Sequence, residues 1–133
     1  MSGKLLDTNV VINGIKGIDS ARNFLLKFEN EYRVSSVTLG ELLFGAEKSR
    51  LSETNKSTYL SFCNFVGVID IDSKIAQTYG KIKNDLFQKG KPIPENDIWI
   101  AATAIAKEMT LASYDKHFEN VDGLDFIHLE IEK

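Results

Sequence analysis

The sequence has almost nothing that could crosslink the fold or hold it in a membrane. It contains one cysteine, Cys63, so it can form neither an internal disulfide nor a thiolate metal cluster. Any bound metal must therefore be held by oxygen or histidine ligands. No apolar run approaches the roughly 20 residues that cross a bilayer, and the N-terminus lacks a signal peptide. We expect a cytoplasmic protein with no membrane contact, in which Cys63 is a small buried hydrophobic residue.

Other absences narrow the function and the domain organisation. The chain has no glycine-rich phosphate loop of the G-x-G-x-x-G or Walker type, which disfavours nucleotide binding. Its net charge of −3 disfavours a generic basic nucleic-acid binder. There is no repeat, low-complexity tract or flexible linker, and 133 residues with 43% hydrophobic content suit a single packed core. We therefore expect one domain over residues 1–133.

Short strands alternate with longer helices along the chain. We expect five strands, at residues 4–6, 32–35, 68–70, 110–113 and 126–129. Apolar residues at helical spacing predict helices through residues 21–28, 39–46, 59–66, 72–90 and 96–108, and a short one at 116–118. Because strands separated by helices need crossover connections, the pattern predicts a three-layer α/β domain with a mainly parallel sheet.

Four acidic residues stand where such a scaffold could bring them together. Asp7 ends the first strand, Glu41 lies in the first turn of the helix after the second strand, and Asp115 follows the fourth strand. Loops that leave the carboxyl ends of parallel strands share one edge of the sheet, where ligand sites are usually built. Asp97 opens the alanine-rich helix and follows no predicted strand, so its arrival at this edge is an inference.

Each acid taken singly has a plainer explanation as a helix cap. Aspartate at an N-cap accepts unpaired backbone N–H bonds, and acidic residues favour the positive end of the helix dipole. The segment TLGE at residues 38–41 even matches a capping box, in which Glu41 would bond the Thr38 amide. Four carboxylates within about 4–6 Å, however, would raise one another's pKa unless a cation lay among them. Mg²⁺ or Mn²⁺ bound in this way is a common device for cutting phosphodiesters.

The segments around these acids resemble the four signatures of PIN-domain ribonucleases, and in particular the VapC-like toxins. They are LDTN at residues 6–9, TLGEL at 38–42 with Gly45, NDIWIAA at 96–102 and SYDKHF at 113–118. The resemblance spans nearly the whole chain. It implies a parallel sheet flanked by helices, a Mg²⁺- or Mn²⁺-dependent endoribonuclease, a homodimer, and neutralisation by a small antitoxin protein. The fourth motif usually carries threonine where Ser113 stands; because the hydroxyl is kept, we expect its hydrogen bond to survive.

These motifs lead to a hypothesis for the mechanism. Asp7, Glu41 and Asp97 would be the main metal ligands, and Asp115 would bind a second ion or act through water. Metal-activated water would hydrolyse RNA, with transfer or ribosomal RNA as the expected substrates, and leave 5′-phosphate and 3′-hydroxyl ends. Asn9 and Ser113 would not bind the metal themselves. They would orient the carboxylates or water by hydrogen bonds.

The basic residues are weaker candidates. If the four site acids are set aside, 15 acidic residues remain against 16 Lys and Arg, so the negative balance is attributable to the site. Lys116 and His117 are possible RNA contacts beside Asp115. The lysines at positions 81, 83, 89 and 91 are expected mainly on a solvated helix face. Trp99 could stack on a base, but it lies in the apolar segment at residues 96–102, so packing or a dimer contact is the expected role. His128 is expected to be structural.

Three rival functions stay open at this point. A phosphotransferase of the haloacid dehalogenase type would need a second aspartate two residues after Asp7, where Asn9 stands. A DNA-acting nuclease of related fold would use the same metal chemistry, although such enzymes usually carry extra acids and insertions. A non-catalytic RNA- or protein-binding module of this fold would be expected to have lost site acids, and all four are present.

Overall fold

Two adjacent leucines, Leu5 and Leu6, show how the layers are built. Successive side chains of a strand point to opposite faces of a sheet. Leu5 packs into one apolar cluster and Leu6 into another, and both side chains are fully buried. Burial of a leucine stabilises a fold by about 1.5–3 kcal/mol, so each face of this strand needs its own covering layer.

The computed structural model describes residues 3–28 and 31–131. Its sheet has five strands in the order β3-β2-β1-β4-β5, and every neighbouring pair is parallel. The strands are β1 (Lys4–Leu6), β2 (Tyr32–Ser35), β3 (Val68–Ile69), β4 (Thr110–Ser113) and β5 (Phe126–His128). The predicted α/β class and parallel sheet are confirmed, and β3 and β5 are each one residue shorter than expected.

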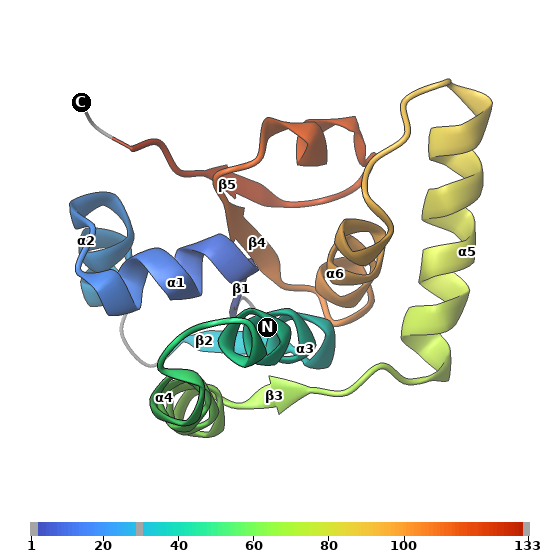
Figure 1. The fold of residues 1–133 in the computed structure, drawn as a ribbon. Coiled ribbons are helices and arrows are strands. Elements are labelled where there is room, and N and C mark those ends of the chain that lie inside the picture. The colour runs from blue at the N-terminus through green and yellow to red at the C-terminus, as the bar shows by residue number, and fades with distance from the viewer. Residues whose placement is uncertain (1–2, 29–30, 132–133) are drawn as a thin grey trace.

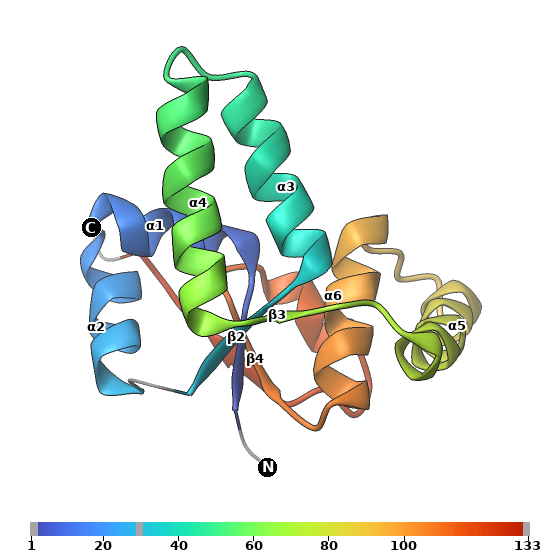
Figure 2. The ribbon, with the colours of Figure 1, turned by 90° about the horizontal axis from the view of Figure 1, so that it is seen from below.

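Helices cover both faces of this sheet (Figure 1). One apolar cluster joins the sheet to α1 (Thr8–Lys16), α2 (Asp19–Lys27), α3 (Ser36–Glu47) and α4 (Ser52–Val66). The other joins it to α5 (Ser73–Gln88), α6 (Glu95–Ala106) and the 3-10 helix η1 (Lys116–Asn120). The predicted three layers are therefore present. Figure 2 shows α3 and α4 as a hairpin that projects from the sheet.

One helix boundary differs from the prediction in a way that affects the site. The helix α3 begins at Ser36, directly after β2, and its N-cap is Ser35, whose hydroxyl accepts a 3.0 Å hydrogen bond from the Val37 amide. The predicted capping box of Thr38 and Glu41 is therefore wrong, because Ser35 caps the helix three residues earlier. Glu41 lies in the second turn of α3 rather than the first, and its carboxylate is free to bond elsewhere.

Smaller features agree with the sequence pattern. Cys63 is buried and free, as expected, and burial raises the pKa of its thiol. Gly17 ends α1 with φ of 79°, a left-handed conformation that glycine adopts without strain. Within the part of the chain that the structure describes, none of the helices is both long and apolar enough to cross a membrane.

Candidate active site

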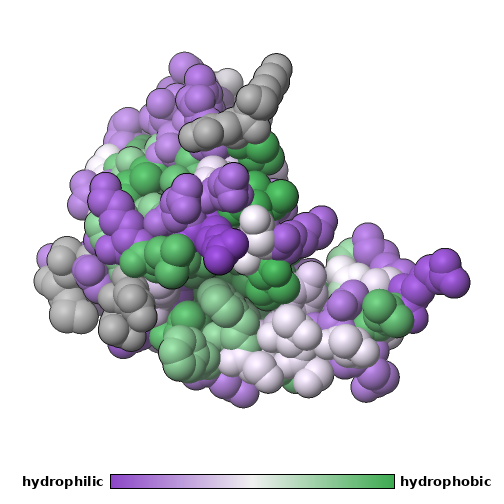
Figure 3. All heavy atoms as spheres, turned by 90° about the vertical axis from the view of Figure 1, so that its left-hand side faces the viewer, coloured by the Kyte–Doolittle hydropathy of each residue, from purple (hydrophilic) through white to green (hydrophobic). Residues whose placement is uncertain are grey.

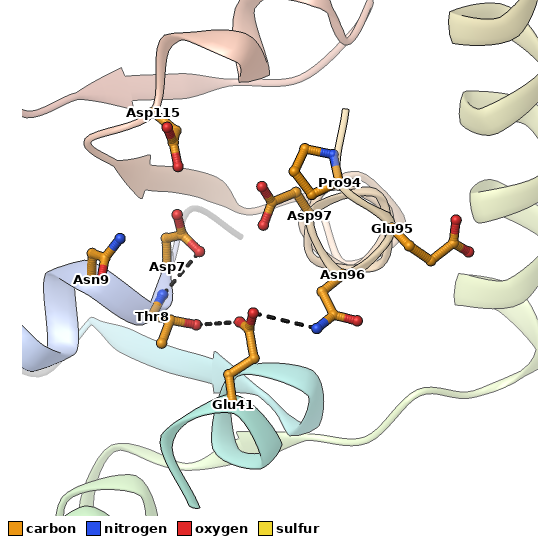
Figure 4. Close-up of a pocket in the computed structure, with 9 residues that line it drawn as sticks. All are labelled: Asp7, Thr8, Asn9, Glu41, Pro94, Glu95, Asn96, Asp97 and Asp115. Carbon is orange, nitrogen blue, oxygen red and sulfur yellow. Dashed lines mark hydrogen bonds between the residues drawn. The ribbon is translucent and has the colours of Figure 1, made fainter. Parts of the chain in front are cut away.

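A pocket of about 450 Å³ opens at the carboxyl edge of the sheet, where β1 and β4 end (Figure 4). All four predicted site acids line it: Asp7 follows β1, Glu41 comes from α3, Asp97 from α6 and Asp115 from the turn after β4. Asp97 reaches the edge because α6 begins there, although no strand precedes that helix. The other lining residues are Thr8, Asn9, Pro94, Glu95 and Asn96.

Asp7 is both a helix cap and a member of the pocket. Its backbone is extended, and one carboxylate oxygen accepts a 2.9 Å hydrogen bond from the Thr8 amide at the start of α1. The other oxygen accepts a 2.6 Å bond from the buried Ser113 hydroxyl, which comes from the neighbouring strand β4. Burial raises the pKa of Asp7; the bonds from Ser113 and Thr8 oppose the rise, and the charges of Glu41 and Asp115 add to it.

Glu41 is held by donors from two other helices. The Thr8 hydroxyl of α1 donates a 2.5 Å hydrogen bond to one carboxylate oxygen, and the Asn96 amide of α6 donates a 3.3 Å bond to the other (Figure 4). Neither Thr8 nor Asn96 was predicted to have this role. Their positions could have suggested it, because Thr8 directly follows Asp7 and Asn96 directly precedes Asp97 in the sequence.

Asp97, Asp115 and His117 form a second group of neighbouring side chains at the site. The His117 Nε2 atom lies 2.8 Å from Asp97 Oδ2, and its Nδ1 atom lies 3.8 Å from Asp115 Oδ1. Burial raises the pKa of Asp97 to about 6; the charge of Asp7 adds to the rise, and His117 opposes it. His117 was predicted to be a possible RNA contact, and the structure places its ring against these two acids.

The residues present fit a divalent cation. None of the nine lining residues is a lysine or arginine that could balance the carboxylates. One ligand atom each from Asp97, Asp115 and His117 lies within 4.8 Å of the others, and the buried His117 Nε2 atom has no aligned hydrogen-bond partner in residues 3–28 and 31–131. Carboxylate oxygens are the ligands that Mg²⁺ and Mn²⁺ prefer, and Mn²⁺ also accepts imidazole.

The two predicted supporting residues behave differently. Ser113 keeps a hydrogen bond, as expected, and the structure identifies Asp7 as its partner; Ser113 also accepts a 3.0 Å bond from the Asp115 amide, so it links two of the acids. Asn9 lines the pocket and is exposed, and its side chain makes no hydrogen bond with the described residues. The orienting role of Asn9 therefore stays a prediction.

The basic residues divide into free and paired side chains. Lys116 is exposed at the start of η1, beside Asp115, and the described part of the chain offers it no ion pair. Lys83 pairs with Glu95 at 2.9 Å, and Lys89 pairs with two acids, Asp85 at 3.0 Å and Asp122 at 3.2 Å. The paired lysines are less available to a phosphate backbone than Lys116.

The two remaining candidates are structural. Trp99 packs against Tyr79 of α5 with ring centroids 3.7 Å apart and planes inclined by 10°, which confirms the predicted packing role. His128 Nε2 lies 3.0 Å from the Tyr114 carbonyl oxygen, at hydrogen-bonding distance, consistent with a structural role in β5.

Comparisons with known proteins agree with this geometry. The family model described as PIN domain matches residues 4–124. Ribonuclease VapC2 of Rickettsia felis is 37% identical over 124 residues, which cover 90% of this chain and 92% of the relative. The tRNA(fMet)-specific endonuclease VapC of Shigella flexneri is 34% identical over 122 residues, with the same coverage of 90% and 92%. A solved structure of VapBC2 from Rickettsia felis, bound to promoter DNA, has a TM-score of 0.88 at 32% identity and covers 98% of this chain and 100% of its own. The chain therefore belongs to the PIN-domain family, among the VapC ribonucleases.

Proposed function

We propose that this chain is the toxin of a toxin–antitoxin pair and hydrolyses RNA at the acidic pocket, with transfer RNA as the first substrate to test. The observation that carries the proposal is the convergence of Asp7, Glu41, Asp97 and Asp115 from four separate segments on one pocket. A binding module would have no need for four converging carboxylates that repel one another. The relative from Shigella flexneri, named as a transfer-RNA endonuclease, supports the choice of substrate.

The acids and their neighbours have distinct roles in this proposal. Asp7, Glu41 and Asp97 bind Mg²⁺ or Mn²⁺, and Asp115 binds a second ion or orients water. When bound, such an ion lowers the pKa of water and offsets negative charge on the phosphate. Ser113 fixes the Asp7 carboxylate through its 2.6 Å bond, and Thr8 fixes that of Glu41. Asn9, which is exposed and lines the pocket, orients water in this proposal.

The RNA approaches the pocket past Lys116. This side chain is exposed and directly follows Asp115, so its ammonium can attract a backbone phosphate toward an otherwise acidic site. His117, the other residue predicted as a possible RNA contact, instead faces Asp97 and Asp115. In-line attack by water leaves a 5′-phosphate on one product and a 3′-hydroxyl on the other.

A protein partner fits the surface on the side of α1, α2 and α4. These helices carry large apolar side chains that are 40–84% exposed, namely Ile15, Leu26, Leu60 and Phe65. Figure 3 looks onto this side of the molecule and shows apolar surface between polar regions. Exposed apolar surface of this kind usually marks a protein interface. We propose a small antitoxin and a second copy of this chain as the partners, in the cytoplasm.

The test is to map new 5′ ends in RNA from cells that express the protein. Wild type is expected to produce new ends, and Asp7→Asn to produce none while keeping the fold. Asp70→Asn, which alters an exposed acid outside the pocket, is the matched control and should cut like wild type. Cleavage by Asp7→Asn at the wild-type rate would overturn the proposed site. The absence of new ends in wild type would favour a binding module, or a DNA nuclease if the purified protein with Mg²⁺ or Mn²⁺ cuts DNA instead.

A further inference from the structure

The geometry points to His117 as a metal ligand: we propose that its imidazole binds a divalent ion together with Asp97 and Asp115, and that it makes the site favour Mn²⁺ over Mg²⁺. This inference rests on the proposed function, because it concerns the ion that the acidic pocket binds. It goes further, because it assigns a nitrogen ligand to a site otherwise lined by oxygen donors.

The three side chains are close to the spacing of ligands around one ion. Ligands about 2.1 Å from an ion stand about 3 Å apart when they are adjacent and about 4.2 Å apart when they are opposite. His117 Nε2 lies 2.8 Å from Asp97 Oδ2, and one ligand atom from each of the three residues lies within 4.8 Å of the others. A small shift of the side chains would direct all three at a common centre.

The His117 Nε2 atom is buried beside a carboxylate oxygen without the alignment of a hydrogen bond. It is buried, and although Asp97 Oδ2 lies 2.8 Å away, the two are not aligned for a hydrogen bond, nor is any other acceptor in residues 3–28 and 31–131. Buried polar side-chain atoms are nearly always bonded, so this nitrogen calls for an explanation. The other histidine differs, because His128 Nε2 lies 3.0 Å from a backbone carbonyl oxygen.

The surroundings hold the imidazole where it is. The ring lies beside the fully buried Phe118, with centroids 4.8 Å apart and planes inclined by 56°. His117 follows Asp115 by two residues at the start of η1, so both come from one short turn, whereas Asp97 comes from α6. Two separate elements, η1 and α6, thus set the separation between the histidine and the Asp97 carboxylate.

The nitrogen ligand determines which ion is favoured. Mg²⁺ prefers oxygen ligands and retains its waters, whereas imidazole suits transition metals, whose affinities for mixed sites rise from Mn²⁺ onward. A site with two carboxylates and one imidazole should therefore bind Mn²⁺ more tightly than Mg²⁺. Replacing the imidazole by an amide should weaken Mn²⁺ binding by at least about tenfold, because even the loss of a group that only supports a ligand typically costs about that much, and should change Mg²⁺ binding less.

Pulsed electron paramagnetic resonance of the untagged protein loaded with Mn²⁺ alone tests this directly. The chain has two histidines, so a ¹⁴N coupling from a coordinated imidazole can come only from His117 or His128. The coupling should appear in wild type and in His128→Gln, change to that of ¹⁵N on histidine labelling, and vanish in His117→Gln. Titration of free Mn²⁺, with and without competing Mg²⁺, gives the affinities of each variant.

The outcomes separate this inference from the proposed function. Mn²⁺ that binds in wild type without a nitrogen coupling, or with one that survives His117→Gln, overturns the histidine ligand and leaves the acidic metal site intact. Failure of wild type to bind either ion overturns both. If His117→Gln does not fold by circular dichroism, the coupling in His128→Gln decides the question, because that variant retains a single histidine.

Discussion

The Thr8 hydroxyl donates a 2.5 Å hydrogen bond to the Glu41 carboxylate, across 33 positions of sequence. The Thr38 hydroxyl lies 3.2 Å from that of Thr8, so a short chain of polar groups runs behind Glu41. The other Glu41 oxygen is bonded by Asn96. Because a glutamate side chain has several rotatable bonds, these contacts select the one orientation that directs it into the pocket.

Replacement Thr8→Val should separate the role of this hydroxyl from the shape of the side chain. Valine retains the branched shape but cannot bond Glu41, so we expect metal affinity and cleavage to fall about 10-fold to 100-fold. The cleavage rate measured against Mg²⁺ concentration checks this, and Thr8→Ser should restore most of the activity. Equal rates of Thr8→Val and wild type at every Mg²⁺ concentration would contradict the positioning role.

The raised pKa of Asp97 predicts how stability depends on pH without metal. A carboxyl group with a pKa raised to about 6 in the folded state favours folding fully below its unfolded value of 3.8. That contribution is lost as the pH rises through about 6. We therefore expect Asp97→Asn to gain stability relative to wild type between pH 4 and 7, by about 1 kcal/mol or more, or a few °C in Tm.

Thermal or urea unfolding of both proteins in EDTA, at pH 4.5, 6 and 7.5, measures this difference. Excess Mg²⁺ or Mn²⁺ at pH 7.5 should reverse it, because an ion that binds only the folded wild-type protein adds to its stability. If the stability difference between wild type and Asp97→Asn did not vary with pH, the pKa of Asp97 would not be raised in the folded protein, and the prediction would be wrong.

Sequence alone predicted the sheet and three of the acids because both follow from local pattern. Asp7 and Asp115 follow the ends of β1 and β4, and Glu41 lies in the helix that follows β2; parallel pairing brings these strand ends to one edge. Asp97 reaches this edge because α6 begins there, and the periodicity of the sequence does not predict that position. The resemblance to PIN-domain ribonucleases was the stronger reason to expect Asp97 in the site. The capping box at Thr38 and Glu41 failed because an equally good cap, Ser35, lay three residues earlier.

The hydrogen bonds behind the acids could not be predicted in the same way. Thr8 and Asn96 meet Glu41 only after α1, α3 and α6 have packed together. No spacing in the sequence encodes a contact across 33 or 55 positions. Ser113 was identified as a polar support, but its partner Asp7 became apparent only from the pairing of β1 with β4.

Trp99 should report helix packing rather than RNA binding. It stacks on Tyr79 of α5 and is not among the residues that line the acidic pocket. Because the ring is only partly buried, Trp99→Ala should cost about 1–3 kcal/mol of stability in urea unfolding, with Trp99→Phe milder. Trp99 is the single tryptophan, so its fluorescence can be followed in Asp7→Asn as RNA is added. Strong quenching there would instead support base stacking.

Lys116 should contribute to RNA attraction without contributing to chemistry. Its exposed ammonium has no ion pair in the described part of the chain and stands beside Asp115 at the pocket. Lys116→Ala should therefore raise KM several-fold, leave kcat nearly unchanged, and reduce the slope of log KM against log salt by about one. The matched control is Lys89→Ala, because Lys89 is held by Asp85 and Asp122 at 3.0 and 3.2 Å and should leave KM and its salt slope unaltered. Equal changes in the two variants would mean that net charge, rather than the position of Lys116, attracts the RNA.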